Sequence, residues 1–106
     1  MTFHCIDISD ALPIMENNAT IVDIRDLTSF HNSHITNAIS LTNDNVQDFI
    51  DRAAKDQPVI VCCYHGNSSK GAAEYLASQG FKEVYSLNGG FSQWSAMFPE
   101  QCETGS

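Results

Sequence analysis

The fold is decided by the stretch Val59-Ile60-Val61-Cys62-Cys63-Tyr64-His65-Gly66-Asn67-Ser68-Ser69-Lys70. Residues 59–62 form a short apolar run rich in β-branched side chains, which is typical of a buried central strand in a parallel sheet. Ser68 or Ser69 is suited to cap a helix that follows. Apolar residues 72, 73, 76 and 77 would share one face of this helix, and Gly80 would end it. The stretch therefore predicts a strand, a tight loop and a helix.

Cys63 lies where this strand ends and the helix begins. Gly66 allows the loop to turn back tightly, so that backbone N–H groups can point inward. These groups and the positive end of the helix favour a thiolate over a thiol. Cys63 is accordingly the candidate nucleophile, whereas Cys62 points to the other side of the strand and is expected to be a buried structural residue. The rest of the loop forms the candidate anion site: Tyr64, His65, Gly66, Asn67, Ser68, Ser69 and Lys70.

Composition narrows the class of protein. The chain has 106 residues, enough for a single domain with one modest core, and we expect residues 1–106 to form one domain. Its net charge of −8 argues against binding to nucleic acid or to anionic membranes. Residues 1–10 do not resemble a signal peptide, and two of the four cysteines are adjacent. We therefore expect reduced thiols in the cytoplasm, with no metal site, because adjacent cysteines do not fit the usual spacing of ligands.

The remaining segments alternate between strand and helix patterns. Expected strands cover residues 3–8, 20–24, 38–41 and 84–87; expected helices run from Ser9 to about 17, from 26 to 32, from Asn43 to about 54, and from 91 to 98; and residues 33–35 are expected to form a loop. This alternation predicts an α/β fold with a parallel sheet that has helices on both faces. Ligands bind beyond the carboxyl ends of the strands in such folds, so Cys63, Arg25-Asp26 and Asn88-Gly89-Gly90 should share one rim.

Three separated blocks resemble a known family. They are Val22-Asp23-Ile24-Arg25-Asp26 with Ser33-His34-Ile35; Cys63-Tyr64-His65-Gly66-Asn67-Ser68; and Val84-Tyr85-Ser86-Leu87-Asn88-Gly89-Gly90-Phe91 with Trp94. Together these blocks resemble the single-domain rhodaneses, which are thiosulfate sulfurtransferases, and most closely the small bacterial GlpE type. The resemblance runs from about residue 21 to residue 94. It implies a rhodanese-like fold and a structural role for the Asp23–Arg25 pair.

The resemblance also implies a chemistry. Cys63 would take the sulfane sulfur of thiosulfate as a persulfide, release sulfite, and pass the sulfur to cyanide or to a thiol acceptor such as thioredoxin. No metal or organic cofactor would be needed. Many members of the family have Arg directly after the nucleophile, whereas this chain has Tyr64. Attraction of the anion must then come from backbone N–H groups, the helix end, and His65 or Lys70.

Two other functions stay open from the sequence. A cysteine phosphatase of the same fold would need Arg at the sixth position after the nucleophile, where this chain has Ser69 followed by Lys70. A non-catalytic rhodanese-like binding module is the second alternative, although such modules often lack the cysteine. An activity assay separates the three possibilities.

Overall fold

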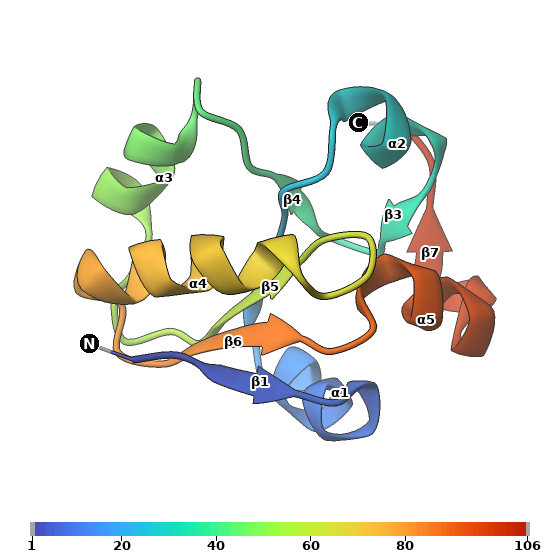
Figure 1. Ribbon diagram of the computed structural model, residues 1–106, viewed down its shortest axis with the longest axis horizontal. Helices are drawn as coiled ribbons and strands as arrows, with labels where there is room; N and C mark the ends of the chain where they lie inside the picture. Colours follow the sequence, from blue (N-terminus) through green and yellow to red (C-terminus); the bar gives the residue numbers. More distant parts are fainter. Residues whose placement is uncertain (1, 106) are drawn as a thin grey trace.

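The computed structural model describes residues 2–105, and a five-stranded sheet forms its centre (Figure 1). The order along the sheet is β1-β6-β5-β2-β4, and all four pairings are parallel. The strands are β1 (His4–Ile6), β2 (Thr20–Asp23), β4 (Ile39–Ser40), β5 (Val59–Cys62) and β6 (Val84–Leu87). The predicted central strand is confirmed, because β5 has neighbours on both sides and all four of its residues are buried.

Helices cover both faces of this sheet, as the alternating pattern predicts. On one face, α1 (Ile8–Glu16) and α5 (Gly90–Met97) pack in a core that includes Ile60, Cys62 and Trp94. On the other face, α3 (Val46–Arg52) and α4 (Ser68–Ser78) pack in a core that includes Val59 and Val61. Successive residues of β5 thus enter opposite cores, which is the period-two alternation of a strand.

Loops that follow neighbouring strands meet at one edge of the sheet. The Ile24 N–H after β2 donates to the Cys62 carbonyl at 2.9 Å, and the Phe91 N–H after β6 donates to the Cys63 carbonyl at 2.8 Å. In Figure 1 the loop between β5 and α4 curls beside the segment that joins β6 to α5. The predicted common rim is therefore confirmed.

Residues 33–35 differ from the prediction. His34–Ile35 is a strand, β3, which pairs antiparallel with β7 (Cys102–Glu103). The His34 ring is stacked on Phe30 of α2 (Leu27–Asn32) at 3.8 Å, and its Nδ1 is 2.7 Å from the Phe30 carbonyl. The loop prediction was wrong because the partner strand comes from the far end of the chain, which follows α5 and the short 3₁₀ turn Pro99–Gln101.

The starts of three helices also differ. Asp7, not Ser9, precedes α1, so Pro13 lies inside the helix rather than in its first turn. Residues 43–45 form turns, and α3 begins only at Val46, because the Asn45 side chain accepts a hydrogen bond from the Thr42 N–H and holds the preceding turn. Asn67 precedes α4, and neither serine acts as its cap. Within residues 2–105, no helix combines the length and the apolar character needed to cross a membrane.

Candidate active site

The loop after β5 wraps around the sulfur of Cys63. Its Sγ accepts the backbone N–H of Gly66 at 3.1 Å and that of Ser69 at 3.2 Å. The Ser69 hydroxyl lies 3.3 Å from the same sulfur. Ser69 is in the first turn of α4, so its N–H belongs to the positive end of that helix. The predicted inward N–H groups are therefore present, and they converge on one sulfur atom.

A second hydroxyl supports this arrangement from the sheet. Ser86 of β6 is fully buried, and its Oγ lies 2.7 Å from the Ser69 Oγ. When Cys63 is ionised, the Ser69 hydroxyl can donate to the sulfur while it accepts the hydroxyl proton of Ser86. Sequence reasoning missed Ser86. The signal that could have revealed it is a small polar residue within the otherwise apolar strand Val84–Leu87, since a buried hydroxyl needs a partner.

The two adjacent cysteines differ in acidity. Burial works against ionisation of Cys63, but hydrogen bonds from the Ser69 hydroxyl and from the amides of Ser69, Gly66 and His65 hold the pKa of Cys63 below its ordinary value. Burial, reinforced by the nearby Asp23 carboxylate, raises the pKa of Cys62 far above its ordinary value. Of these two cysteines, Cys63 is thus the one whose thiolate form the structure favours.

Two glycines let the loop come this close to its neighbours. Gly66 has φ +95°, and a Cβ there would lie 2.9 Å from the Gly89 nitrogen. Gly90 has φ +57°, and a Cβ there would lie 2.4 Å from the Cys63 carbonyl oxygen. Both positions need a left-handed conformation and also lack space for a side chain. The glycine pair that follows β6 is therefore part of the packing of the active-site loop.

The Asp23–Arg25 pair joins several segments beside the site. Arg25 Nη2 is 2.8 Å from Asp23 Oδ2 and 2.7 Å from the Ser33 carbonyl oxygen. The guanidinium also lies 4.1 Å from the centroid of the Phe91 ring. Asp23 is fully buried, so its carboxylate needs this partner. These contacts agree with the structural role expected from the sequence.

A cavity of about 340 Å³ opens at Cys63. Although Cys63 is only 4 % exposed, it contributes to the wall of this cavity. The lining residues are Ile24, Arg25, Asp26, Ser29, Cys63, Tyr64 and Ser68. The sequence analysis placed Arg25 and Asp26 on the rim that they share with Cys63, but it did not assign Ile24 or Ser29 to the site.

The residues predicted to bind the anion take different positions. Gly66 and Ser69 contact the Cys63 sulfur, and His65 acts on it through its backbone amide. Tyr64 and Ser68 line the cavity. Asn67, Lys70 and His65 are exposed and do not line the cavity, and the Tyr64 and His65 rings meet edge to face with centroids 4.4 Å apart. In the described part of the chain, no group of three His, Cys, Asp or Glu side chains could hold a metal ion.

Comparison with known proteins identifies the family. The model of the rhodanese-like domain matches residues 9–97. The chain belongs to the rhodanese family. A protein named thiosulfate sulfurtransferase GlpE from Ectopseudomonas mendocina is 51 % identical over 104 residues, which is 98 % of this chain and 95 % of the relative. One of the same name from Pseudomonas savastanoi is 44 % identical and covers 97 % of each chain.

Solved structures agree with this rhodanese fold. The rhodanese-like domain of an Anabaena protein, solved in solution, has a TM-score of 0.80 and 25 % identity to this chain. The match covers 94 % of this chain and 78 % of the Anabaena chain. The parallel sheet with helices on both faces is therefore the family's fold, and the Cys63 loop of this rhodanese occupies the carboxyl edge of that sheet.

Proposed function

We propose that this chain is a thiosulfate sulfurtransferase that carries sulfur as a persulfide on Cys63. The observation that supports this most directly is the set of donors around one sulfur: the N–H groups of Gly66 and Ser69 at 3.1 and 3.2 Å and the Ser69 hydroxyl at 3.3 Å. Preorganised donors of this kind stabilise an anion without rearranging during the reaction. Relatives of nearly the same length carry the name thiosulfate sulfurtransferase.

The first half-reaction loads the enzyme. The Cys63 thiolate attacks the outer sulfur of thiosulfate, the sulfur–sulfur bond of thiosulfate breaks, and sulfite leaves with the bonding electron pair. A persulfide remains on Cys63. Tyr64 and Ser68 border the cavity in which the donor would lie. We assign the other loop residues to the same anion site: His65, Gly66, Asn67, Ser69 and Lys70.

The second half-reaction discharges the enzyme. Cyanide or a thiolate attacks the outer sulfur of the persulfide, and Cys63 leaves as a thiolate that the loop again stabilises. Thioredoxin is a candidate protein acceptor for this step. Both half-reactions are displacements at sulfur that need no metal, and the thiols themselves carry the protons. The mechanism therefore uses no cofactor.

The same proposal covers the setting of the reaction. Residues 1–106 act as one rhodanese domain, with both cores built on the same sheet. The four cysteines are all free thiols, and the chemistry requires Cys63 to stay reduced, so we place the activity in the cytoplasm. With a net charge of −8, neither nucleic acid nor an anionic membrane is a partner.

A cysteine phosphatase is the main alternative on this fold. Such an enzyme would need an arginine at the position of Ser69, to hold the phosphate group of the substrate with two hydrogen bonds. Ser69 is instead buried, and its hydroxyl faces Ser86 and the Cys63 sulfur. We expect negligible hydrolysis of aryl phosphates, and turnover comparable with sulfur transfer would favour the phosphatase.

Steady-state kinetics with thiosulfate and cyanide test the proposal. Because the persulfide enzyme is a discrete intermediate, double-reciprocal plots at several fixed cyanide concentrations should give parallel lines. Intersecting lines would indicate a ternary complex and contradict the mechanism. Absence of any thiocyanate would instead indicate the non-catalytic binding module.

A further inference from the structure

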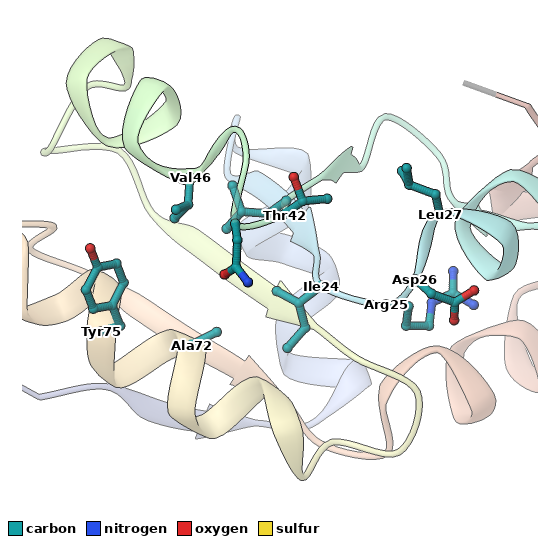
Figure 2. Close-up of a pocket in the computed structure, with 10 residues that line it drawn as sticks. Ile24, Arg25, Asp26, Leu27, Thr42, Val46, Ala72 and Tyr75 are labelled. Atoms are coloured by element: carbon teal, nitrogen blue, oxygen red, sulfur yellow. The ribbon is translucent and has the colours of Figure 1, made fainter.

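A larger cavity adjoins the one that contains Cys63. Its volume is about 650 Å³, which lies within the range of about 300–1,000 Å³ that is usual for small-molecule sites. In Figure 2 it lies between α4, which contributes Ala72 and Tyr75, and the start of α3 with the loop before it, which contribute Val46 and Thr42. Ile24 lies between the two sides, at the end of β2.

The two cavities share part of their wall. Ile24, Arg25 and Asp26 line both of them. The larger cavity therefore borders the one that contains Cys63. The larger cavity does not contact the loop donors that hold the Cys63 sulfur, so the loading of sulfur described above leaves it unused.

The wall of the larger cavity is mainly apolar. It includes Ile24, Leu27, Leu41, Val46, Ala72 and Tyr75. Leu27 is 52 % exposed and Tyr75 is 44 % exposed, so two large side chains at this cavity are left uncovered by the rest of the described chain. Such a wall favours a ligand with an apolar body.

Among the residues that line this cavity, Asp26 carries the one charge without an ion-pair partner. The Arg25 guanidinium is paired with the Asp23 carboxylate, and its Nη2 also donates to the Ser33 carbonyl. The Asp26 carboxylate accepts the Ser29 hydroxyl at 2.8 Å and the Ser29 N–H at 3.1 Å, and these hydrogen bonds hold the pKa of Asp26 below its ordinary value. Asp26 is thus ionised at neutral pH. The larger cavity is not lined by Gly66 or Ser69, whose N–H groups would hold an anion against this charge at Cys63, so it disfavours an anionic ligand.

We propose that the larger cavity binds the body of the sulfur acceptor, and that this acceptor is a small thiol with an apolar body that is uncharged or cationic. The proposal rests on the function proposed above, since it concerns the second half-reaction. The acceptor thiolate attacks the outer sulfur of the Cys63 persulfide, forming a new sulfur–sulfur bond. The old sulfur–sulfur bond breaks and Cys63 leaves as a thiolate, so no oxidant or reductant is required.

The second half-reaction can be measured alone. The protein is loaded with thiosulfate, freed of excess donor and mixed with an acceptor, and loss of the added sulfur is followed by rapid quenching and intact mass. The probes are phenylmethanethiol, its para-carboxylate 4-(mercaptomethyl)benzoate, and cyanide, which has no body to bind. We expect phenylmethanethiol to react about tenfold faster than the carboxylate, a ratio set by repulsion from Asp26. Equal rates for the two thiols would overturn the proposal.

Two matched variants distinguish the loss of apolar contact with the acceptor from a general effect of removing an exposed apolar side chain. Leu27 and Met97 are both 52 % exposed, but only Leu27 lines the cavity. We expect Leu27→Ala to lower the rate ratio of phenylmethanethiol to cyanide about fivefold, as loss of roughly 1 kcal/mol of apolar contact would. Met97→Ala should leave the ratio unchanged. A small-thiol site would be contradicted if the two substitutions changed this ratio equally. It would also be contradicted if Leu27→Ala slowed only the transfer of sulfur to thioredoxin.

Asp26→Asn tests the role of the negative charge, because asparagine has nearly the same shape as aspartate and is also favoured at a helix N-cap. It should reduce the preference for phenylmethanethiol over its para-carboxylate severalfold. An unchanged preference would show that Asp26 does not select the acceptor.

Binding without chemistry gives an independent readout. Benzyl methyl sulfide has the same body and no thiol, and we expect it to shift backbone amide resonances of residues 41–46 and 72–75 in the unloaded protein. Shifts elsewhere, or none at millimolar concentration, would overturn the acceptor cavity. If thiosulfate fails to load the protein, the proposed function is wrong, and this titration still decides whether the cavity binds such a body.

Discussion

The Ser86 hydroxyl lies 2.7 Å from the Ser69 hydroxyl, and both side chains are fully buried. Through Ser69 this pair reaches the Cys63 sulfur, 3.3 Å from the Ser69 Oγ. Ser69 has a single hydroxyl proton, which it can give either to Ser86 or to the sulfur. When Ser86 donates to Ser69, the Ser69 proton is directed to the sulfur, where it stabilises a thiolate.

Ser86→Ala should therefore make the Cys63 thiolate less stable, although Ser86 itself does not contact the sulfur. We expect alkylation of Cys63 by iodoacetamide at pH 7 to slow by about two- to threefold, less than the net effect of one directly lost hydrogen bond. The midpoint of the alkylation rate against pH should move upward. Ser40→Ala is the matched control, since the Ser40 hydroxyl is buried with no hydrogen-bond partner among residues 2–105. An equal change in both variants would rule out the relay.

The loading of wild-type protein by thiosulfate should depend on pH in one direction. Only the thiolate attacks, so the rate falls as pH drops through the pKa of Cys63 and reaches a plateau above it. The loop hydrogen bonds lower this pKa despite burial, so the half-maximal rate should come at a lower pH than the ionisation of an ordinary cysteine thiol. Single-turnover loading rates measure the profile. A rate that still climbs steeply above pH 9 would mean that the loop does not stabilise the thiolate.

Gly90→Ala should disturb the active-site loop from outside it. The new Cβ would lie 2.4 Å from the Cys63 carbonyl oxygen, so the loop must move. We expect loading to slow by tenfold or more, as about 1 Å of misplacement can cost up to about a hundredfold. Gly71→Ala provides the control, because a Cβ there meets nothing within 4 Å and should stabilise α4 by about 0.5–1 kcal/mol. If thiosulfate loaded Gly90→Ala at the wild-type rate, the loop would not need this close contact.

Asp23→Asn tests whether the Asp23–Arg25 pair is structural. Asp23 is fully buried, and removing its charge leaves Arg25 without a counter-ion, so urea denaturation should show a loss of about 3–5 kcal/mol. Asp48→Asn breaks the exposed pair with Arg52 and should cost less than about 1 kcal/mol. Similar losses in the two variants would contradict the structural role of the buried pair.

Local patterns predicted the centre of the fold well. The β-branched run of β5 and the alternation of strands and helices indicated a parallel sheet with both faces covered, and the structure has this arrangement. The different environments of Cys62 and Cys63 also followed from the strand, because adjacent side chains point to opposite faces. These features depend on residues close together in the sequence.

Features that depend on distant partners were missed. The pairing of β3 with β7 joins segments nearly seventy residues apart. Each of these strands has only two residues, which is too short to show an alternating pattern. Ser69 looked like a helix cap, but its hydroxyl is engaged by Ser86, which lies 17 positions away. Side-chain networks of this kind are set by the tertiary structure rather than by periodicity.

The central claim is that sulfur resides on Cys63, and mass spectrometry tests it most directly. Wild-type protein is incubated with thiosulfate without reductant, and its intact mass and peptides are compared with those of Cys63→Ser and Cys62→Ala. We expect a gain of one sulfur atom in the wild type and in Cys62→Ala, mapped to Cys63, and no gain in Cys63→Ser. A persulfide mapped to Cys62, or a gain of sulfur in Cys63→Ser, would contradict the account.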